Sequence, residues 1–203
     1  MEVVTINKIL LLFFLFSTFT YCDDWFNSIE NNNIESATIL LKSGTNINCK
    51  DKFGDTALII ATKNNLLEMI TFLIKNGADV NAKNNSNSTP LFFANLESAK
   101  ILIDNHVDVN AKDKDGATIL FIADFELSKL LIENNADVNA KDNSNSTPLF
   151  FAVTFNDIDK VKLLINNKAD INHKNDSSHT VLSIAYYSHF TEIINLLKKH
   201  GAK

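Results

Sequence analysis

The amino-acid sequence predicts an all-α solenoid, a stack of about six helix-turn-helix repeats whose turns form β-turn or hairpin fingers. Two observations carry this prediction. The decapeptide NSNSTPLFFA occupies residues 85–94 and returns 58 residues later at 143–152. Strings close to ADVNAK begin at positions 78, 107, 136 and 169, at intervals of 29, 29 and 33 residues. A fixed period of this size indicates stacked units, because one such unit buries its apolar face only against its neighbours.

Each unit is expected to open with a turn and a short first helix. In the unit 51–83, the turn spans 51–55 and has Gly54 where a positive φ angle costs little. Thr56 precedes the apolar run at 58–61, and a Thr side-chain oxygen can accept a hydrogen bond from the first backbone N–H groups of a helix. We therefore expect Thr56 to cap the first helix.

A second helix is expected after a polar break. Gly77 stands where a helix ends in a left-handed residue, and the ADVNAK string then leaves as an extended link to the next turn. Before it, apolar side chains recur at spacings of three and four residues, as on one face of an amphipathic helix: Leu67, Ile70, Leu73 and Ile74.

The same plan extends along the chain. Its two prolines, Pro90 and Pro148, each follow Thr at the first helical position, where a missing backbone N–H is not needed. Residues 25–50 match only the second half of the unit. The predicted repeats are 23–50, 51–83, 84–112, 113–141, 142–174 and 175–203.

The strings Thr-Pro-Leu, at 89–91 and 147–149, and Gly-Ala-Asp-Val-Asn-Ala, at 77–82, resemble the ankyrin repeat over about 23–203. The resemblance implies a scaffold that binds a protein partner. The family's usual His after Thr-Pro-Leu, which joins neighbouring repeats by hydrogen bonds, is absent here. We therefore expect apolar packing to replace that polar connection. The position instead holds Ile59, Phe92, Phe121, Phe150 and Ser183, and the turn Gly is replaced by Asn87, Asn145 and Ser178 in three units.

Two adjacent units, 84–112 and 113–141, are four residues shorter than the units on either side. Alignment places the missing residues between the two helices, after Ala94 and Ala123. We expect each first helix there to lack about one turn, roughly 6 Å of height at 1.5 Å per residue. The two short units would then leave a notch, whose walls would be Lys63, Asn64, Thr154 and Phe155. We hypothesise that this notch receives the partner. The alternative is a deletion tolerated because it falls in a loop, without a role in binding.

The resemblance also implies where a partner binds, namely at the turn residues and at the exposed end of the first helix. Phe53 and Phe155 are the strongest candidates, because an exposed aromatic side chain often anchors an interface. Any one candidate could equally be an ordinary solvent-facing turn residue. The candidates are Lys52, Phe53, Asp55, Lys63, Asn64, Lys114, Asp115, Asn143, Ser144, Ser146, Thr154, Phe155, Asp176, Ser177, His179 and Tyr187.

Composition argues against several functional classes. The formal net charge is −5 and nothing resembles a basic face, which disfavours nucleic-acid binding. The five histidines form neither an HExxH motif nor a Cys/His zinc spacing, and no Gly-rich phosphate loop occurs. We expect no cofactor, no metal and no catalysis, in a monomer that binds a protein. A structural envelope component, or an enzyme or cofactor carrier with chemistry hidden among the repeats, are the alternatives.

The N-terminal segment 1–22 is predicted to be a signal peptide for export from a bacterium. Lys8 is followed by the apolar block 9–16, which is too short for a membrane span of about 20 residues. Cleavage after Cys22 would release a periplasmic or secreted chain. Lipid attachment at Cys22, or an uncleaved segment that anchors the chain in a membrane, are the alternatives.

Cleavage at that point would begin the mature chain at the first repeat. Asp23 and Asp24 would then cap its first helix, which we expect to start near Trp25. Cys49 would remain as the only cysteine, a small half-buried residue without a disulfide partner.

Overall fold

The structure, a computed structural model, describes residues 22–203, so the predicted signal peptide lies outside it except for Cys22. Pairs of short helices follow one another along the chain, and the described residues contain an isolated bridge between Lys50 and Thr56 but no β-strand. This architecture confirms the predicted all-α solenoid. The pairs are residues 22–30 with α2 (Ile34–Lys42), α3 (Ala57–Lys63) with α4 (Leu67–Lys75), the 3₁₀ segment η1 (Pro90–Phe93) with α5 (Leu96–Asp104), the 3₁₀ segment η2 (Ile119–Phe121) with α6 (Phe125–Glu133), α7 (Pro148–Thr154) with α8 (Ile158–Asn166), and α9 (Val181–Tyr187) with α10 (Thr191–Lys199).

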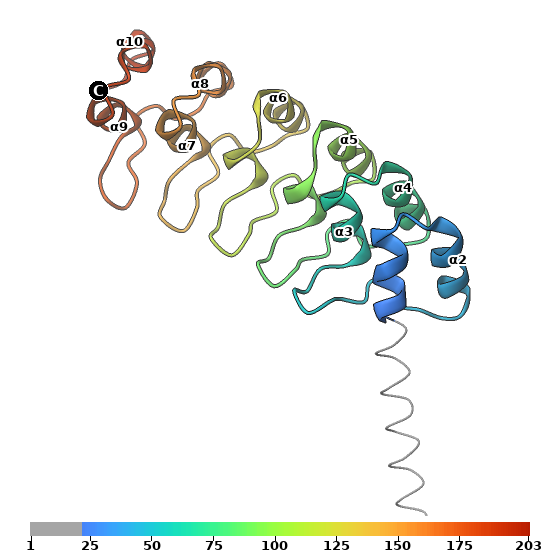
Figure 1. Ribbon diagram of the computed structural model, residues 1–203. Helices are drawn as coiled ribbons and strands as arrows, with labels where there is room; N and C mark the ends of the chain where they lie inside the picture. The colour runs from blue at the N-terminus through green and yellow to red at the C-terminus, as the bar shows by residue number, and fades with distance from the viewer. Residues whose placement is uncertain (1–21) are drawn as a thin grey trace, which may run out of the picture.

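The array has two edges. In Figure 1 the second helices line one edge, the loops between repeats project as fingers at the opposite edge, and the first helices lie between them. The first and last repeats stand at opposite ends. We call the side formed by the fingers and the first helices the inner face.

The first helices begin where the sequence predicts, although the capping bond differs between repeats. Pro90 and Pro148 occupy first helical positions, and the Thr56 side chain accepts a hydrogen bond from the Ile59 N–H. Thr89 and Thr147 make no such side-chain bond, which corrects the expectation of Thr capping in every repeat. The reason is local geometry, because in these repeats the third helical N–H bonds to the carbonyl of the Thr itself in a 3₁₀ turn.

The shortening of the two middle repeats is confirmed. The first helices α3, α7 and α9 have seven residues each, whereas η1 has four and η2 has three. Asn95 then caps α5 directly after Ala94, and Asp124 caps α6 directly after Ala123. The chain therefore turns into the second helix about one helical turn early in both repeats.

Polar connections join neighbouring repeats, which corrects the expectation that apolar packing alone replaces the missing His. An Asn in each extended link accepts a hydrogen bond through its side-chain oxygen from a backbone N–H one repeat later, as Asn81 does from the Asp108 N–H at 2.8 Å. The same bond recurs along the array between Asn48 and Asp79, Asn110 and Asp137, Asn139 and Asp170, and Asn172 and Lys203.

The finger tips are joined in the same way by backbone hydrogen bonds, for example from the Asn85 N–H to the Phe53 carbonyl at 3.0 Å and from the Asn143 N–H to the Asp115 carbonyl at 2.9 Å. Asn87 stands at a finger position with φ of 57°, where the equivalent residue is Gly54 with φ of 77°. Asn therefore replaces Gly in the left-handed conformation, as predicted, because its short polar side chain tolerates it.

The first repeat differs from the prediction at its beginning. Residues from Cys22 onward are already helical, so Asp23 and Asp24 lie inside the helix and do not cap it. Trp25 and Ile29, one turn apart on this helix, are fully buried in the continuous core. Cys49 packs half-buried against that core, as predicted.

Candidate binding surface

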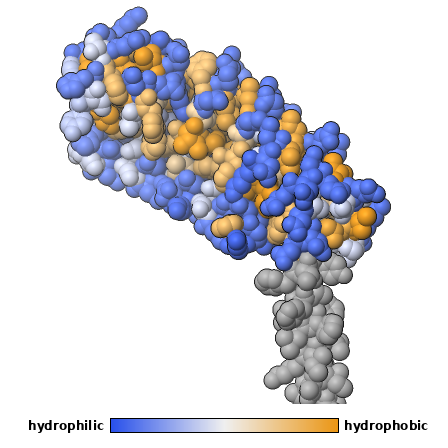
Figure 2. Space-filling view, in the orientation of Figure 1, coloured by the Kyte–Doolittle hydropathy of each residue, from blue (hydrophilic) through white to orange (hydrophobic). Residues whose placement is uncertain are grey.

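One apolar residue in each of the last five repeats stands four positions after the Thr that precedes the first helix, and we call the set the inner row. Its exposure varies, since Ile60 is buried whereas Ile122 is 64% exposed. Figure 2 shows apolar surface gathered over the middle of the array, bordered by hydrophilic surface along the fingers. The inner row consists of Ile60, Phe93, Ile122, Phe151 and Ile184.

The short repeats explain why Ile122 is exposed. After Ala123 the chain enters α6 at once, so no further turn of the first helix covers the Ile122 side chain. In the next repeat, α7 continues to Thr154 and holds Phe155 beyond its end. The shortened first helices η1 and η2 lie between the longer α3 and α7, and we call the surface of η1 and η2 between those helices the floor.

The two walls of this floor carry different chemistry. At the α3 end, the Lys63 ammonium lies 4.4 Å from the centroid of the Phe93 ring and forms an ion pair with Asp55. At the α7 end, the Phe155 side chain is 75% exposed and its ring centroid lies 6.4 Å from that of Phe151. A cation therefore closes one end of the floor and an exposed aromatic ring closes the other.

A buried lysine supports the floor from the next repeat. The Lys160 side chain on α8 is 3% exposed, and its ammonium donates hydrogen bonds to the carbonyl oxygens of Phe121 at 3.2 Å and Ala123 at 2.5 Å. Phe121 is the last residue of η2 and Ala123 lies two residues beyond it, where the Ser128 hydroxyl also donates to the Ala123 carbonyl at 3.2 Å. Burial lowers the pKa of Lys160 to about 8, against the opposing effect of the Asp157 and Asp124 carboxylates.

Most of the predicted binding residues lie exposed along the inner face, but two do not. Asp55 is 3% exposed, because its carboxylate pairs with Lys63 and accepts a hydrogen bond from the Asn84 side chain at 2.8 Å. Ser146 is also buried, and its backbone N–H bonds to the Asp142 carboxylate inside its own finger. The expectation that Asp55 and Ser146 face a partner is therefore wrong, because both side chains lie beneath the fingers.

Sequence reasoning also missed exposed members of the surface. Ile122, on the floor, was not among the candidates, and neither was the partly buried Phe93. The signal was present in the sequence, because both residues stand four positions after a Thr in consecutive repeats. Their exposure follows from the shortened helices.

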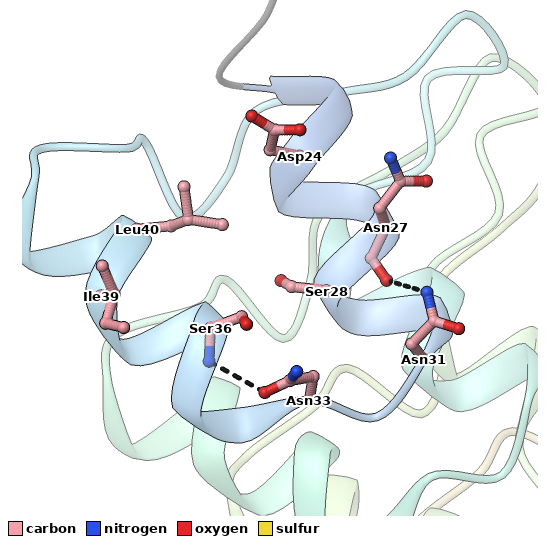
Figure 3. A pocket seen from close by; sticks show the side chains of 8 residues that line it. All are labelled: Asp24, Asn27, Ser28, Asn31, Asn33, Ser36, Ile39 and Leu40. Carbon is pink, nitrogen blue, oxygen red and sulfur yellow. Dashed lines mark hydrogen bonds between the residues drawn. The ribbon is translucent and has the colours of Figure 1, made fainter.

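A second hollow, of about 500 Å³, lies at the N-terminal end of the stack between residues 22–30 and α2 (Figure 3). Its polar side chains bond within the repeat: the Asn31 amide donates to the Asn27 carbonyl at 2.7 Å, and the Asn33 side chain accepts from the Ser36 N–H. Ile39 and Leu40 also line it. Three of its polar side chains, those of Ser28, Asn31 and Asn33, thus bond within the repeat itself.

The part of the chain that the structure describes offers little for other chemistry. Over residues 22–203, no group of three or more His, Cys, Asp or Glu side chains is placed to hold a metal ion. Among the helices in that range, none has the length and apolar character needed to cross a bilayer.

Comparison with known families agrees with the geometry. The sequence pattern described as Ankyrin repeats (3 copies) matches residues 25–113, 93–175 and 120–203, which together span the stacked helix pairs. The chain belongs to the ankyrin repeat family. Ankyrin repeats are generally protein–protein interaction modules. No curated protein matches the sequence.

Proposed function

We propose that this ankyrin repeat protein is a non-catalytic scaffold that binds a protein partner on its inner face, over the floor formed by η1 and η2. The exposed Ile122 side chain carries the proposal. Ile122, 64% exposed, shares its register position with the half-buried Phe93 and Phe151 of the adjacent repeats, and we infer from this alignment that the three side chains form an apolar strip. A continuous apolar strip rimmed by polar residues is typical of a protein interaction site.

The residues at the ends of the floor are also suited to binding a protein partner. Phe155 presents an exposed ring at one end, and interface anchors are commonly aromatic. The retained candidates on the finger tips, among them Lys52, Lys114 and Asp115, form a polar rim beside the strip, and the exposed Phe53 adds a second aromatic ring there. The joined fingers hold this rim in place, which lowers the entropy lost on binding.

Photo-crosslinking tests the location of the site. A benzophenone amino acid replaces Ile122 on the floor in one variant and Lys129 on α6 in the control, which belongs to the same repeat but to the second-helix edge. Both are incubated with extract of the source cells and irradiated. Adducts that form from position 122 and not from 129 support the proposal, and equal labelling from both positions would place the contact elsewhere.

We also propose that the protein acts outside the cytoplasm as a monomer. The apolar block at 9–16 after Lys8 supports export, and the cleavage site after Cys22 would leave the helix that contains Trp25 intact from Asp23 onward. Lipid attachment at Cys22, or an uncleaved segment, would instead hold the same scaffold at a membrane. The mass of the exported chain distinguishes these outcomes.

A further inference from the structure

A row of lysines runs along the array in step with the repeats. The Lys50 ammonium donates a hydrogen bond to the Lys83 carbonyl oxygen at 2.7 Å, Lys83 donates to Lys112 at 3.4 Å, and Lys112 donates to Lys141 at 2.8 Å. All of these side chains are exposed. The lysine row, with one member at the base of each of five successive fingers, consists of Lys50, Lys83, Lys112, Lys141 and Lys174.

The positive charge of this row is not neutralised inside the repeat array. The ion pairs among residues 22–203 join Lys63 to Asp55 and Lys162 to Asp159, so none involves the row. Asp137 lines a hollow with Lys112 and Lys141 but forms no ion pair with either. A carbonyl acceptor holds the ammonium groups of Lys50, Lys83 and Lys112 in place without cancelling their charge.

The acidic residues nearest in sequence are occupied by the backbone. Asp113, which follows Lys112 directly, accepts hydrogen bonds from the N–H groups of Asp115 and Ala117 through one carboxylate oxygen. Asp142 does the same in the next finger. These hydrogen bonds fix the carboxylates within their own fingers and leave their charge, so the lysine row is distinguished by ammonium groups that form no ion pair within residues 22–203.

The lysine row borders the inner row. Lys50 bridges to Thr56, the residue that precedes α3, and Lys50, Phe53 and Ile60 line one hollow of about 800 Å³ together with the Phe26 side chain. Each lysine precedes its inner-row residue by ten positions, as Lys50 precedes Ile60, in all five repeats. Because the repeats stack in one register, the lysine row runs along the apolar strip, beside acidic residues of the same fingers such as Asp51 and Asp113.

We propose that the partner segment is an amphipathic helix with an apolar face and acidic residues along one edge, spaced seven apart. The inference rests on the proposed function, since it names the chemistry of what lies on the inner face. Helices in contact lie about 8–10 Å apart, which sets the spacing between successive lysines. Seven residues of an α-helix rise about 10.5 Å and return to the same side, so carboxylates at that interval meet one lysine per repeat.

A displayed peptide library tests the charge preference. The library fixes a helix of 21 residues with a leucine face and randomises three edge positions, seven apart, among Glu, Gln and Lys. We expect selection on the wild-type protein to enrich Glu at all three positions at least tenfold over Lys. Enrichment should fall as salt rises, because exposed charges are screened. Equal recovery of Glu and Lys peptides, including equal absence of binding, would overturn the inference.

Matched variants test whether the lysine row causes the preference for Glu peptides. Lys83→Glu, Lys112→Glu and Lys141→Glu together should reverse it toward Lys peptides, and the three Lys→Gln changes should abolish it without reversal. The control changes Lys75, Lys100 and Lys129 to Glu, which are exposed on second helices of three successive repeats and should leave the Glu preference intact. A control that shifts the preference as much as the row variant would contradict the assignment. Circular dichroism and thermal melting confirm that each variant folds.

One more variant separates this inference from the proposed function. Ile122→Asp places a charge on the floor and should abolish binding of every peptide. If it does so while wild-type selection shows no Glu preference, the inner face binds but the charge inference is wrong. If Glu peptides are enriched and Ile122→Asp does not affect them, the lysine row binds them and the proposed apolar site is wrong.

Discussion

The Lys160 ammonium lies 2.5 Å from the carbonyl oxygen of Ala123, in the neighbouring repeat. Ala123 is followed by Asp124, the cap of α6. In the longer repeat 142–174 the equivalent carbonyl, that of Ala152, accepts a hydrogen bond from the Asp157 N–H. The four-residue deletion removes such an N–H at Ala123, and its carbonyl accepts instead from the Lys160 ammonium and from the Ser128 hydroxyl, the latter at 3.2 Å.

This contact predicts a pH dependence of stability. The pKa of Lys160 is about 8 in the folded chain against 10.5 for an ordinary lysine, so between these values the unfolded chain binds more protons. The free energy of unfolding should therefore rise as pH increases from 8 to 10.5, by an upper bound of about 3 kcal/mol at 1.36 kcal/mol per pKa unit. Urea denaturation at intervals across this range measures the rise.

A variant isolates the contribution of Lys160. Burial beside Cys22 raises the pKa of the Cys49 thiol to about 12 from 9.0, which lowers stability as pH increases above 9 and opposes the lysine. Subtracting the free energy of unfolding of Lys160→Met from that of wild type cancels the Cys49 contribution, because both chains retain Cys49. This difference should grow in favour of wild type as pH rises. If the two free energies change with pH in parallel, Lys160 does not titrate in this range.

Two neighbouring residues should respond very differently to truncation. Phe121 is 3% exposed and its ring meets that of Phe151 edge-on at 5.1 Å between centroids, so Phe121→Ala should cost about 3–5 kcal/mol. Ile122→Ala, at an exposed position, should stay within about 0.5 kcal/mol of wild type. Chemical denaturation compares the two, and a Phe121→Ala cost as small as that of Ile122→Ala would mean that the assigned register of this repeat is wrong.

Substitution by alanine should destabilise the chain more at the finger glycine, Gly54, than at the helix-end glycine, Gly77. Both residues have positive φ. A Cβ at Gly54 would lie 2.7 Å from the Asn85 backbone nitrogen, whereas a Cβ at Gly77 would have no such neighbour within 4 Å. Gly77→Ala should cost about 1–2 kcal/mol from backbone strain alone, and Gly54→Ala should cost more. Asn87→Gly, at an equivalent finger position, should be neutral or mildly stabilising. Equal costs at Gly54 and Gly77 would contradict the close packing of the fingers.

Export can be checked by mass. Protein purified from the source cells should begin near Asp23, because cleavage after Cys22 removes the apolar block at 9–16. Intact-mass measurement identifies the first residue, and a lipid at Cys22 would add its own mass. A chain that retains residues 1–8 in the cytoplasmic fraction would rule out export.

Repetition made most of the fold readable from the sequence. Because each repeat meets the same neighbours, the 29- and 33-residue intervals revealed the stack, and alignment around Ala94 and Ala123 revealed the shortened helices. The Asn that accepts a hydrogen bond one repeat later, such as Asn81, was visible as a repeated letter. Its bond was not, because it depends on how two links lie side by side.

The binding surface was less predictable, because exposure depends on contacts between repeats. Asp55 looked like a turn residue, yet Lys63 from the end of its helix and Asn84 from the next finger enclose it. Lys160 occupies the register position of the buried Met69 and Leu127 of other repeats, which is a sequence signal of burial. Its hydrogen bonds to the Phe121 and Ala123 carbonyls depend on contacts between repeats and have no such signal.

The central claim is that the floor formed by η1 and η2 binds the partner. It is tested most directly by measuring the partner affinity of a chain in which the missing helical turns are restored. A copy of the residues at 62–65 is inserted after Ala94 and after Ala123, and Lys160→Met accompanies the insertions because longer helices would supply the η2 carbonyls with backbone donors. Titration calorimetry measures the partner captured at position 122. We predict at least a hundredfold loss of affinity in a chain that still melts cooperatively, and unchanged affinity would contradict the role of the floor in binding.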